Sequence, residues 1–140
     1  MTSAVRLLGL LLLLTFAAPG VFAQAPAQAP GETGIRDVIT RQLEALDKGD
    51  GVAAFAIASP TIQQMFRDAP TFMSMVERGY PQVLHSRAHR FLNLTTDDGR
   101  LIQRVFIESD AGTVIGSYEM IQIDGLWRIN GVAFEKMEAT

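Results

Sequence analysis

Residues 90–134 read "RFLNLTTDDGRLIQRVFIESDAGTVIGSYEMIQIDGLWRINGVAF", and this stretch decides the fold. It contains four runs that are rich in β-branched and aromatic residues, which is the composition typical of strands. Turn signals separate the runs at residues 97–99 (DDG), 110–112 (DAG) and 124–125 (DG). Aspartate and glycine between alternating runs are a strong short-range signal for a hairpin. The stretch therefore predicts an antiparallel meander of four strands.

The half of the chain before this stretch is helical in pattern. Apolar residues recur at helical spacing over residues 35–46, and Gly49 follows as a stop signal. Asp50 is placed to cap a second short helix, which Pro60 is expected to end. One or two further helical turns follow, and Asp68 then begins the last helix. Helices followed by strands predict an α+β fold, with short helices packed on one face of a curved four-stranded antiparallel sheet.

The N-terminal segment predicts export. One arginine precedes an apolar run at residues 7–18, and small residues follow at the spacing that a signal peptidase reads. The run is shorter than the roughly 20 residues needed to span a bilayer. We therefore expect a cleaved signal peptide at residues 1–23, an Ala/Pro-rich linker at 24–34, and a single folded domain at 35–140. The expected location is periplasmic or secreted in a bacterium, with no stable membrane insertion after cleavage.

The composition excludes several kinds of site. The chain has no cysteine, so it has no disulfide, thiolate zinc site or cysteine nucleophile. Its formal net charge of −3 gives no broad basic field for nucleic acid. No Gly-x-Ser-x-Gly motif of a serine hydrolase is present either. We therefore expect no cofactor and no nucleic-acid partner.

Four segments carry a resemblance to a known family. They are "AFAIASPTIQQMF" (54–66), "TFMSMVERGYPQV" (71–83), "QRVFIESDAG" (103–112) and "DGLWRING" (124–131). They resemble a family of small exported bacterial proteins whose function is unassigned. The order of elements also resembles the nuclear transport factor 2-like, or cystatin-like, cone. The resemblance implies that fold, export and no assigned activity, and it supplies no catalytic residues.

A histidine pair raises the question of a metal. His85 and His89 are four residues apart, which is the spacing of metal ligands on one helix face. A third ligand would have to come from elsewhere, such as Glu108 or Asp110, and the arginines beside the pair repel a cation. We expect no metal here, and we interpret "HSRAHRF" (85–91) as a helix-to-strand junction.

The same region suits an anion better than a metal. His89, Arg90 and Arg104 would converge if the first two strands pair, and guanidinium groups bind carboxylates or phosphates. The alternative is that each arginine pairs with a carboxylate on a neighbouring strand, which contributes little to stability. We favour this second interpretation and expect mild anion affinity at most.

The leading functional hypothesis is non-catalytic binding of a small apolar or amphipathic ligand, or of a peptide. The ligand would lie in a pocket between the helices and the sheet. Large aromatic side chains with polar edges are suited to such a site. We expect Trp127, Tyr118 and Phe72 to anchor the ligand, with Arg104 as the polar contact.

Two further patterns bear on this pocket. Strict alternation along the last strand places Trp127, Ile129, Gly131 and Ala133 on one face, where a tryptophan beside small residues either walls a pocket or packs in the core. The methionines within residues 65–75 supply adaptable apolar surface, which either lines a cavity or fills space between short helices.

Two other classes of function stay open. The first is an interaction module, because the second strand is apolar on both alternations: Val105 and Ile107 on one face, Ile102 and Phe106 on the other. A sheet that helices cover on one side then needs a partner for its outer side, which predicts a homodimer through that face.

The second alternative is an enzyme that uses a buried carboxylate as a general acid or base. Glu108, Glu119 or His89, near Tyr118, would supply the reacting group. The spacing of these residues does not say whether any of them points into a dry pocket.

Overall fold

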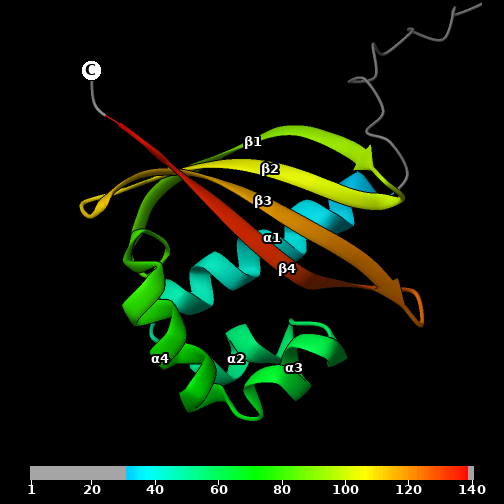
Figure 1. The fold of residues 1–140 in the computed structure, drawn as a ribbon, viewed down its shortest axis with the longest axis horizontal. Coiled ribbons are helices and arrows are strands. Elements are labelled where there is room, and N and C mark those ends of the chain that lie inside the picture. Colours follow the sequence, from blue (N-terminus) through cyan, green and yellow to red (C-terminus); the bar gives the residue numbers. More distant parts are fainter. Residues whose placement is uncertain (1–30, 139–140) are drawn as a thin grey trace, which may run out of the picture.

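The computed structural model describes residues 31–138, which form four helices followed by four strands. The strands make one antiparallel sheet in the order β1-β2-β3-β4. The predicted α+β class is confirmed, and the curved sheet with helices on one side is compatible with the nuclear transport factor 2-like cone (Figure 1). The elements are α1 (Glu32–Asp47), α2 (Gly51–Ala56), α3 (Pro60–Phe66), α4 (Ala69–Gly79), the 3-10 turn η1 (Pro81–Val83), β1 (Ser86–Asp97), β2 (Arg100–Ser109), β3 (Gly112–Ile123) and β4 (Leu126–Met137).

The breaks between the helices lie close to the predicted positions. The side chains of Asp50 and Asp68 each accept a hydrogen bond from the backbone N–H three residues later, so they cap α2 and α4 as expected. Pro60 was expected to end the second helix, but it begins α3 with Ser59 as the cap. Proline is favoured at the first helical position because its missing N–H would be unpaired there in any case.

The domain begins slightly earlier than predicted. α1 starts at Glu32, so the last residues of the expected linker belong to the helix, and residues 1–30, with the predicted signal peptide, lie outside the described residues. The cause is Trp127, whose indole packs on the start of α1. A Cβ at Gly34 would lie 2.8 Å from Trp127 Cδ1, and one at Gly31 would lie 2.9 Å from Cζ2. Only glycine permits this close approach.

Two hairpin turns have the geometry that their sequences predicted. Asp98 and Gly99 have φ angles of 49° and 75°, and Asp124 and Gly125 have 51° and 78°. Positive φ at both central residues is the signature of the type I′ turn, which matches the twist of the strands it joins. The helix-to-strand junction comes slightly earlier than predicted, since β1 already begins at Ser86.

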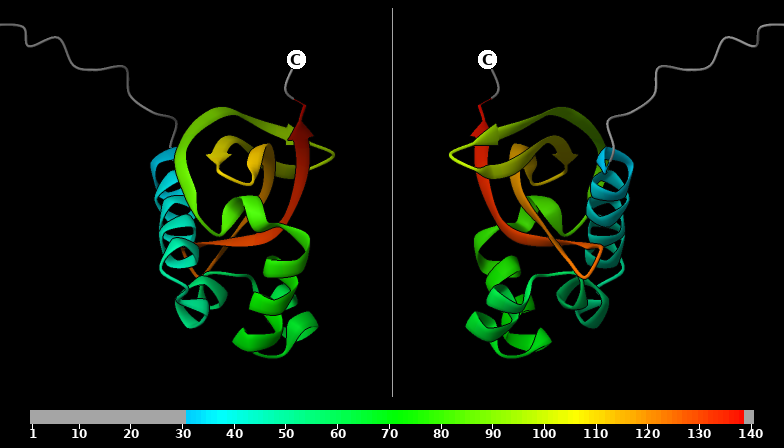
Figure 2. Two further views of the ribbon diagram at one scale, coloured as in Figure 1. Left: turned by 90° about the vertical axis from the view of Figure 1, so that its left-hand side faces the viewer. Right: turned by 90° about the vertical axis from the view of Figure 1, so that its right-hand side faces the viewer.

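One face of the sheet, here called the inner face, packs against the helices. α1 lies along this face, and α2, α3 and α4 gather below it in the view of Figure 1; Figure 2 shows the sheet curving around them. No helix among residues 31–138 has the length and apolar character needed to cross a membrane. The buried strand residues of the inner face are Gln103, Val105, Ile107, Val114, Tyr118, Met120 and Ile129.

A bulge in β4 changes which residues face inward. The register with β3 slips at Asn130, so that residue is extra and the side-chain alternation shifts by one beyond it. Val132 and Phe134 consequently pack on the core, whereas Ala133 is exposed on the outer face. The expectation that Ala133 shares a face with Trp127 is therefore wrong, because strict alternation does not continue through a bulge.

Candidate functional site

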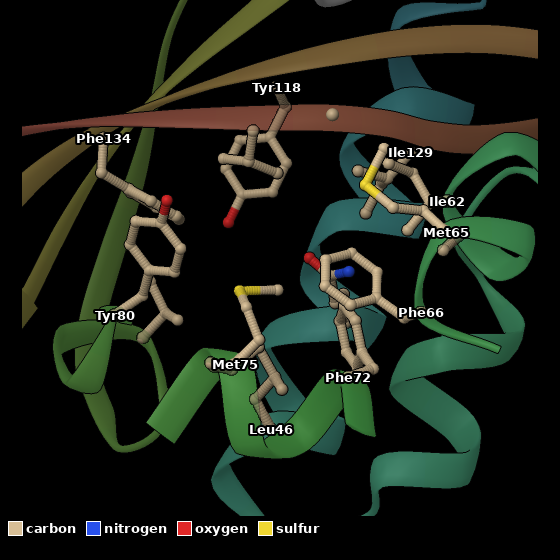
Figure 3. A pocket seen from close by; sticks show the side chains of 16 residues that line it. Leu46, Ile62, Met65, Phe66, Phe72, Met75, Tyr80, Tyr118, Ile129 and Phe134 are labelled. Atoms are coloured by element: carbon tan, nitrogen blue, oxygen red, sulfur yellow. The ribbon is translucent and has the colours of Figure 1, made fainter. Parts of the chain in front are cut away.

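A pocket of about 230 Å³ lies between the inner face of the sheet and the helices (Figure 3). We call it the cone pocket. Its walls come from α1, α3, α4, η1, β3 and β4, so nearly every layer of the fold contributes to it. The lining residues are Gln42, Leu46, Ala58, Ile62, Met65, Phe66, Phe72, Met75, Val76, Tyr80, Val83, Tyr118, Ile129, Gly131, Val132 and Phe134.

The lining of the cone pocket is almost wholly apolar. Among the lining residues within 31–138, only Gln42, Tyr80 and Tyr118 carry a side-chain nitrogen or oxygen, and none is an Asp, Glu, Lys, Arg or His. Small-molecule sites commonly have this composition, in which apolar walls surround a few placed polar groups. The chemistry of the site therefore depends on these three side chains.

Tyr118 on β3 is the central polar group. Its side chain is 1% exposed, and its hydroxyl makes no hydrogen bond within residues 31–138. In Figure 3 the phenol extends from the sheet with its oxygen toward the interior of the pocket. Burial raises the pKa of this phenol above its usual value of 10.0, so it stays protonated at neutral pH and acts as both donor and acceptor.

Gly116 determines how the Tyr118 ring lies. The two residues share the inner face of β3, and a Cβ at Gly116 would come within 2.8 Å of Tyr118 Cε2. The same Cβ would lie 3.1 Å from Phe134 Cε1, and Phe134 packs edge-on against Tyr118 with ring centroids 6.3 Å apart. The missing side chain thus leaves room for both rings beside the pocket.

Gln42 on α1 is the second buried polar group of the pocket. It is 5% exposed, and its amide makes no hydrogen bond within the described part of the chain. The amide of the buried Gln103 is paired in part: its Nε2 donates to Leu92 O at 3.0 Å and to Arg104 O at 2.9 Å, while its Oε1 has no partner within residues 31–138. Gln42 therefore presents unused hydrogen-bonding capacity toward the pocket.

The wall formed by α3 is the most loosely packed side of the cone pocket. None of its residues is fully buried, and Met65 is 64% exposed although it lines the pocket. The start of α3 is fixed to the sheet, because Ser59 Oγ donates to Asn130 Oδ1 at 2.8 Å. Methionine side chains adapt readily to different shapes, so this side is suited to admit and enclose a ligand.

The structure brings two of the predicted anchors into the pocket and leaves two others outside. Tyr118 and Phe72 line it, as predicted. Trp127 does not line it, because its indole packs on the start of α1. Arg104 lies on the outer face of the sheet and donates to Glu135 at 3.3 Å. It therefore cannot be the polar contact for a ligand in this pocket.

The predicted anion cluster is not assembled. His89 and Arg90 are adjacent in β1, so their side chains point to opposite faces of the sheet. His89 lies on the inner face with its Nε2 3.4 Å from Thr40 Oγ1, whereas Arg90 stacks over the Phe106 ring at 5.1 Å on the outer face. His89 thus cannot converge with Arg90 and Arg104. Arg104 does pair with a carboxylate, but its partner is Glu135 of β4 and not a residue of an adjacent strand.

The histidine pair has no helix beneath it. His85 is exposed just before β1, with its Nδ1 3.5 Å from Asp47 Oδ1, and His89 lies within the strand. Within residues 31–138, no three side chains of histidine, cysteine, aspartate or glutamate gather as a metal ion would require.

The carboxylates considered for catalysis also lie away from the pocket. Glu108 is exposed on the outer face, and Glu119 is on the same face, where it accepts from Asn130 Nδ2 at 2.9 Å. Neither lines the cone pocket, and His89 does not line it either. The residue that sequence reasoning missed is Gln42, which falls on the buried face of α1 among apolar residues. The sequence signal for Gln42 was a polar residue at a position where the helical spacing of apolar residues predicts a core side chain.

The matching family model spans residues 28–140, which includes every described residue of the domain and the whole cone pocket. The chain belongs to the DUF4864 family, a domain of unknown function. No curated protein matches the chain. The DUF4864 assignment agrees with the unassigned function that the resemblance implied, and it leaves the activity to be argued from the cone pocket.

Proposed function

We propose that this DUF4864 domain binds a small amphipathic molecule in the cone pocket without changing it chemically. The apolar part of the ligand contacts the aromatic and aliphatic walls, and its polar group pairs with Tyr118 and Gln42. One observation carries the proposal: a buried hydroxyl and a buried amide, each without a hydrogen bond to residues 31–138, face one apolar pocket.

The energetics favour this interpretation over an idle cavity. More than about 90% of buried polar groups in folded proteins are paired, and leaving one unpaired costs about 1–3 kcal/mol. The hydroxyl of Tyr118 and the amide of Gln42 make no hydrogen bond to residues 31–138 at this pocket, whereas the fully enclosed atoms without a partner in that range are Arg36 Nε and Gln103 Oε1. A ligand that hydrogen-bonds to them recovers part of this cost and also removes apolar surface from water. Real proteins tend to break such local rules at functional sites.

The volume of the pocket limits the size of the ligand. A cavity of about 150 Å³ in another protein binds benzene, so the 230 Å³ here corresponds by proportion to about nine non-hydrogen atoms. At about 0.5–0.9 kcal/mol per atom, such a ligand binds with a dissociation constant between about 1 mM and 1 μM. A longer molecule would extend past Met65 into solvent.

The place of action belongs to the same proposal. The basic residue, short apolar run and small residues within 1–23 support export, so we infer that the domain meets its ligand outside the cytoplasm.

Native mass spectrometry tests the proposal, with organic extraction of the full chain purified under mild conditions. We expect a bound small molecule in the wild type and its loss in Val132→Phe, which fills the cone pocket from β4. The matched control is Val52→Phe, the same change on a side chain that is 74% exposed on α2. A wild type that retains nothing and also fails to bind any octyl compound would overturn the proposal.

A further inference from the structure

We propose that the polar group of the ligand is neutral: a hydroxyl, carbonyl or amide, and not a carboxylate, phosphate or ammonium. This inference rests on the proposed function and narrows its ligand to one chemical class. It depends on the charges around the cone pocket, on the donors and acceptors that Tyr118 and Gln42 present, and on the size of the cavity.

The cone pocket offers no charge to neutralise an ion. In the part of the chain that the structure describes, no acidic or basic side chain lines it. Three cationic side chains of the sheet have other contacts: Arg104 pairs with Glu135, Arg128 donates to Ala56 O, and Arg90 stacks on an aromatic ring of the outer face. A charged headgroup would therefore enter an apolar site unpaired, which weakens binding on the order of a hundred-fold or more.

The hydrogen-bonding groups of the pocket also suit a neutral partner. The phenol of Tyr118 and the amide of Gln42 each present both a donor and an acceptor. A ligand hydroxyl can donate to one of these groups and accept from the other at the same time. A ligand carbonyl or amide also finds a complementary group in the pocket. A carboxylate would use only the donors of these two groups and an ammonium only their acceptors, and neither ion would find an opposite charge among the described lining residues.

The state of Tyr118 supports the same choice. Burial raises the pKa of its phenol, which is 1% exposed, so the side chain supplies no negative charge for an ammonium group at neutral pH. Together with a volume that fits about nine non-hydrogen atoms, this points to a medium-chain alcohol, ketone or amide, or to the neutral end of a longer molecule.

The test compares three probes with the same chain: 1-octanol, octanoate and octylammonium, titrated into the full chain at about pH 7, where both ions are charged. Dissociation constants come from calorimetry or ligand-observed NMR. We expect 1-octanol to bind on the order of a hundred times more tightly than either ion. We also expect Tyr118→Phe and Gln42→Leu to weaken 1-octanol about five- to tenfold while leaving the ions unchanged.

The outcomes separate this inference from the proposed function. Suppose that 1-octanol binds less than about tenfold more tightly than the ions, and that Val132→Phe still blocks binding while Val52→Phe does not. The inference of a neutral polar group would then be wrong, but the proposed binding in the cone pocket would still hold. Failure of all three probes to bind the wild type overturns the proposed function itself. If both Tyr118→Phe and Gln42→Leu bind 1-octanol as the wild type does, the headgroup contacts assigned here are wrong. Circular dichroism and urea denaturation of each variant confirm that it is folded.

Discussion

Replacing Tyr118 by phenylalanine is expected to stabilise the ligand-free domain. The change removes one buried hydroxyl that has no hydrogen bond to residues 31–138 and keeps the ring that packs on Phe134. In most proteins, removing a buried polar group destabilises the fold because a partner is left unpaired. Here no protein partner is left behind, so the sign of the effect is reversed.

The size of this effect follows from the burial of Tyr118. An unpaired buried hydroxyl costs about 1–3 kcal/mol in proteins. Water in the pocket recovers part of that cost, so we expect the free energy of unfolding to rise by about 0.5–1.5 kcal/mol. For a domain of this size, about 1 kcal/mol shifts the melting temperature by roughly 4–8 °C. The variant should therefore melt roughly 2–12 °C above the wild type.

The assay is urea and thermal denaturation of protein that has been unfolded, stripped of bound molecules and refolded. The matched control is Tyr80→Phe, which removes the same atom from a half-buried side chain of the same pocket and should change stability by less than about 0.5 kcal/mol. If Tyr118→Phe instead lowered stability by about 1 kcal/mol, the hydroxyl would have a protein partner after all, and the argument for a ligand-binding group would fail.

Three other predictions follow from the fold. Burial raises the pKa of Tyr118 above its usual value of 10.0, so the free energy of unfolding should fall as the pH rises above about 10. Urea denaturation at alkaline pH should show a smaller fall for Tyr118→Phe than for the wild type. Gly34→Val, which drives a side chain into Trp127, should cost about 1–3 kcal/mol, whereas Gly79→Ala, with no atom near its Cβ, should be neutral or slightly stabilising in the same assay. Light scattering at tens of micromolar should show a homodimer that Phe106→Glu dissociates, and a monomeric wild type would refute the outer-face interface.

Local signals explain why most of the fold could be predicted. Aspartate-glycine turns and helix caps act within a few residues, so the hairpins and helix starts at Asp50 and Asp68 were visible in the sequence. The bulge in β4 was not visible, because it depends on tertiary contacts. Asn130 is held by Ser59 of the α2–α3 connection and itself donates to Glu119. No periodicity in β4 alone reports those two partners.

The site could be predicted only in part. Alternation along β3 and the apolar face of α4 place Tyr118 and Phe72 toward the core, which is enough to nominate them as anchors. Alternation does not say which part of the inner face is filled and which part is open. Trp127 of β4 packs on the glycines at the start of α1, which are distant from it in the sequence. Because of this contact, the indole does not line the pocket. Arg104 was misplaced because the buried face of β2 was not known.

The buried polar residues of the domain differ in whether the fold itself uses their side chains. Ser59 and Ser109 are buried, and both make side-chain hydrogen bonds that cap or close a turn. Tyr118, Gln42 and Gln82 are also buried, without a side-chain hydrogen bond to residues 31–138, and the first two line the cone pocket. Phenylalanine at position 118 and leucine at position 42 would complete an apolar core there. Gly116 adds to the contrast, because a side chain there would crowd the Tyr118 ring. Gln42 and Tyr118 line one cavity, and the bound molecule proposed above would account for both, because it would pair with the two polar groups.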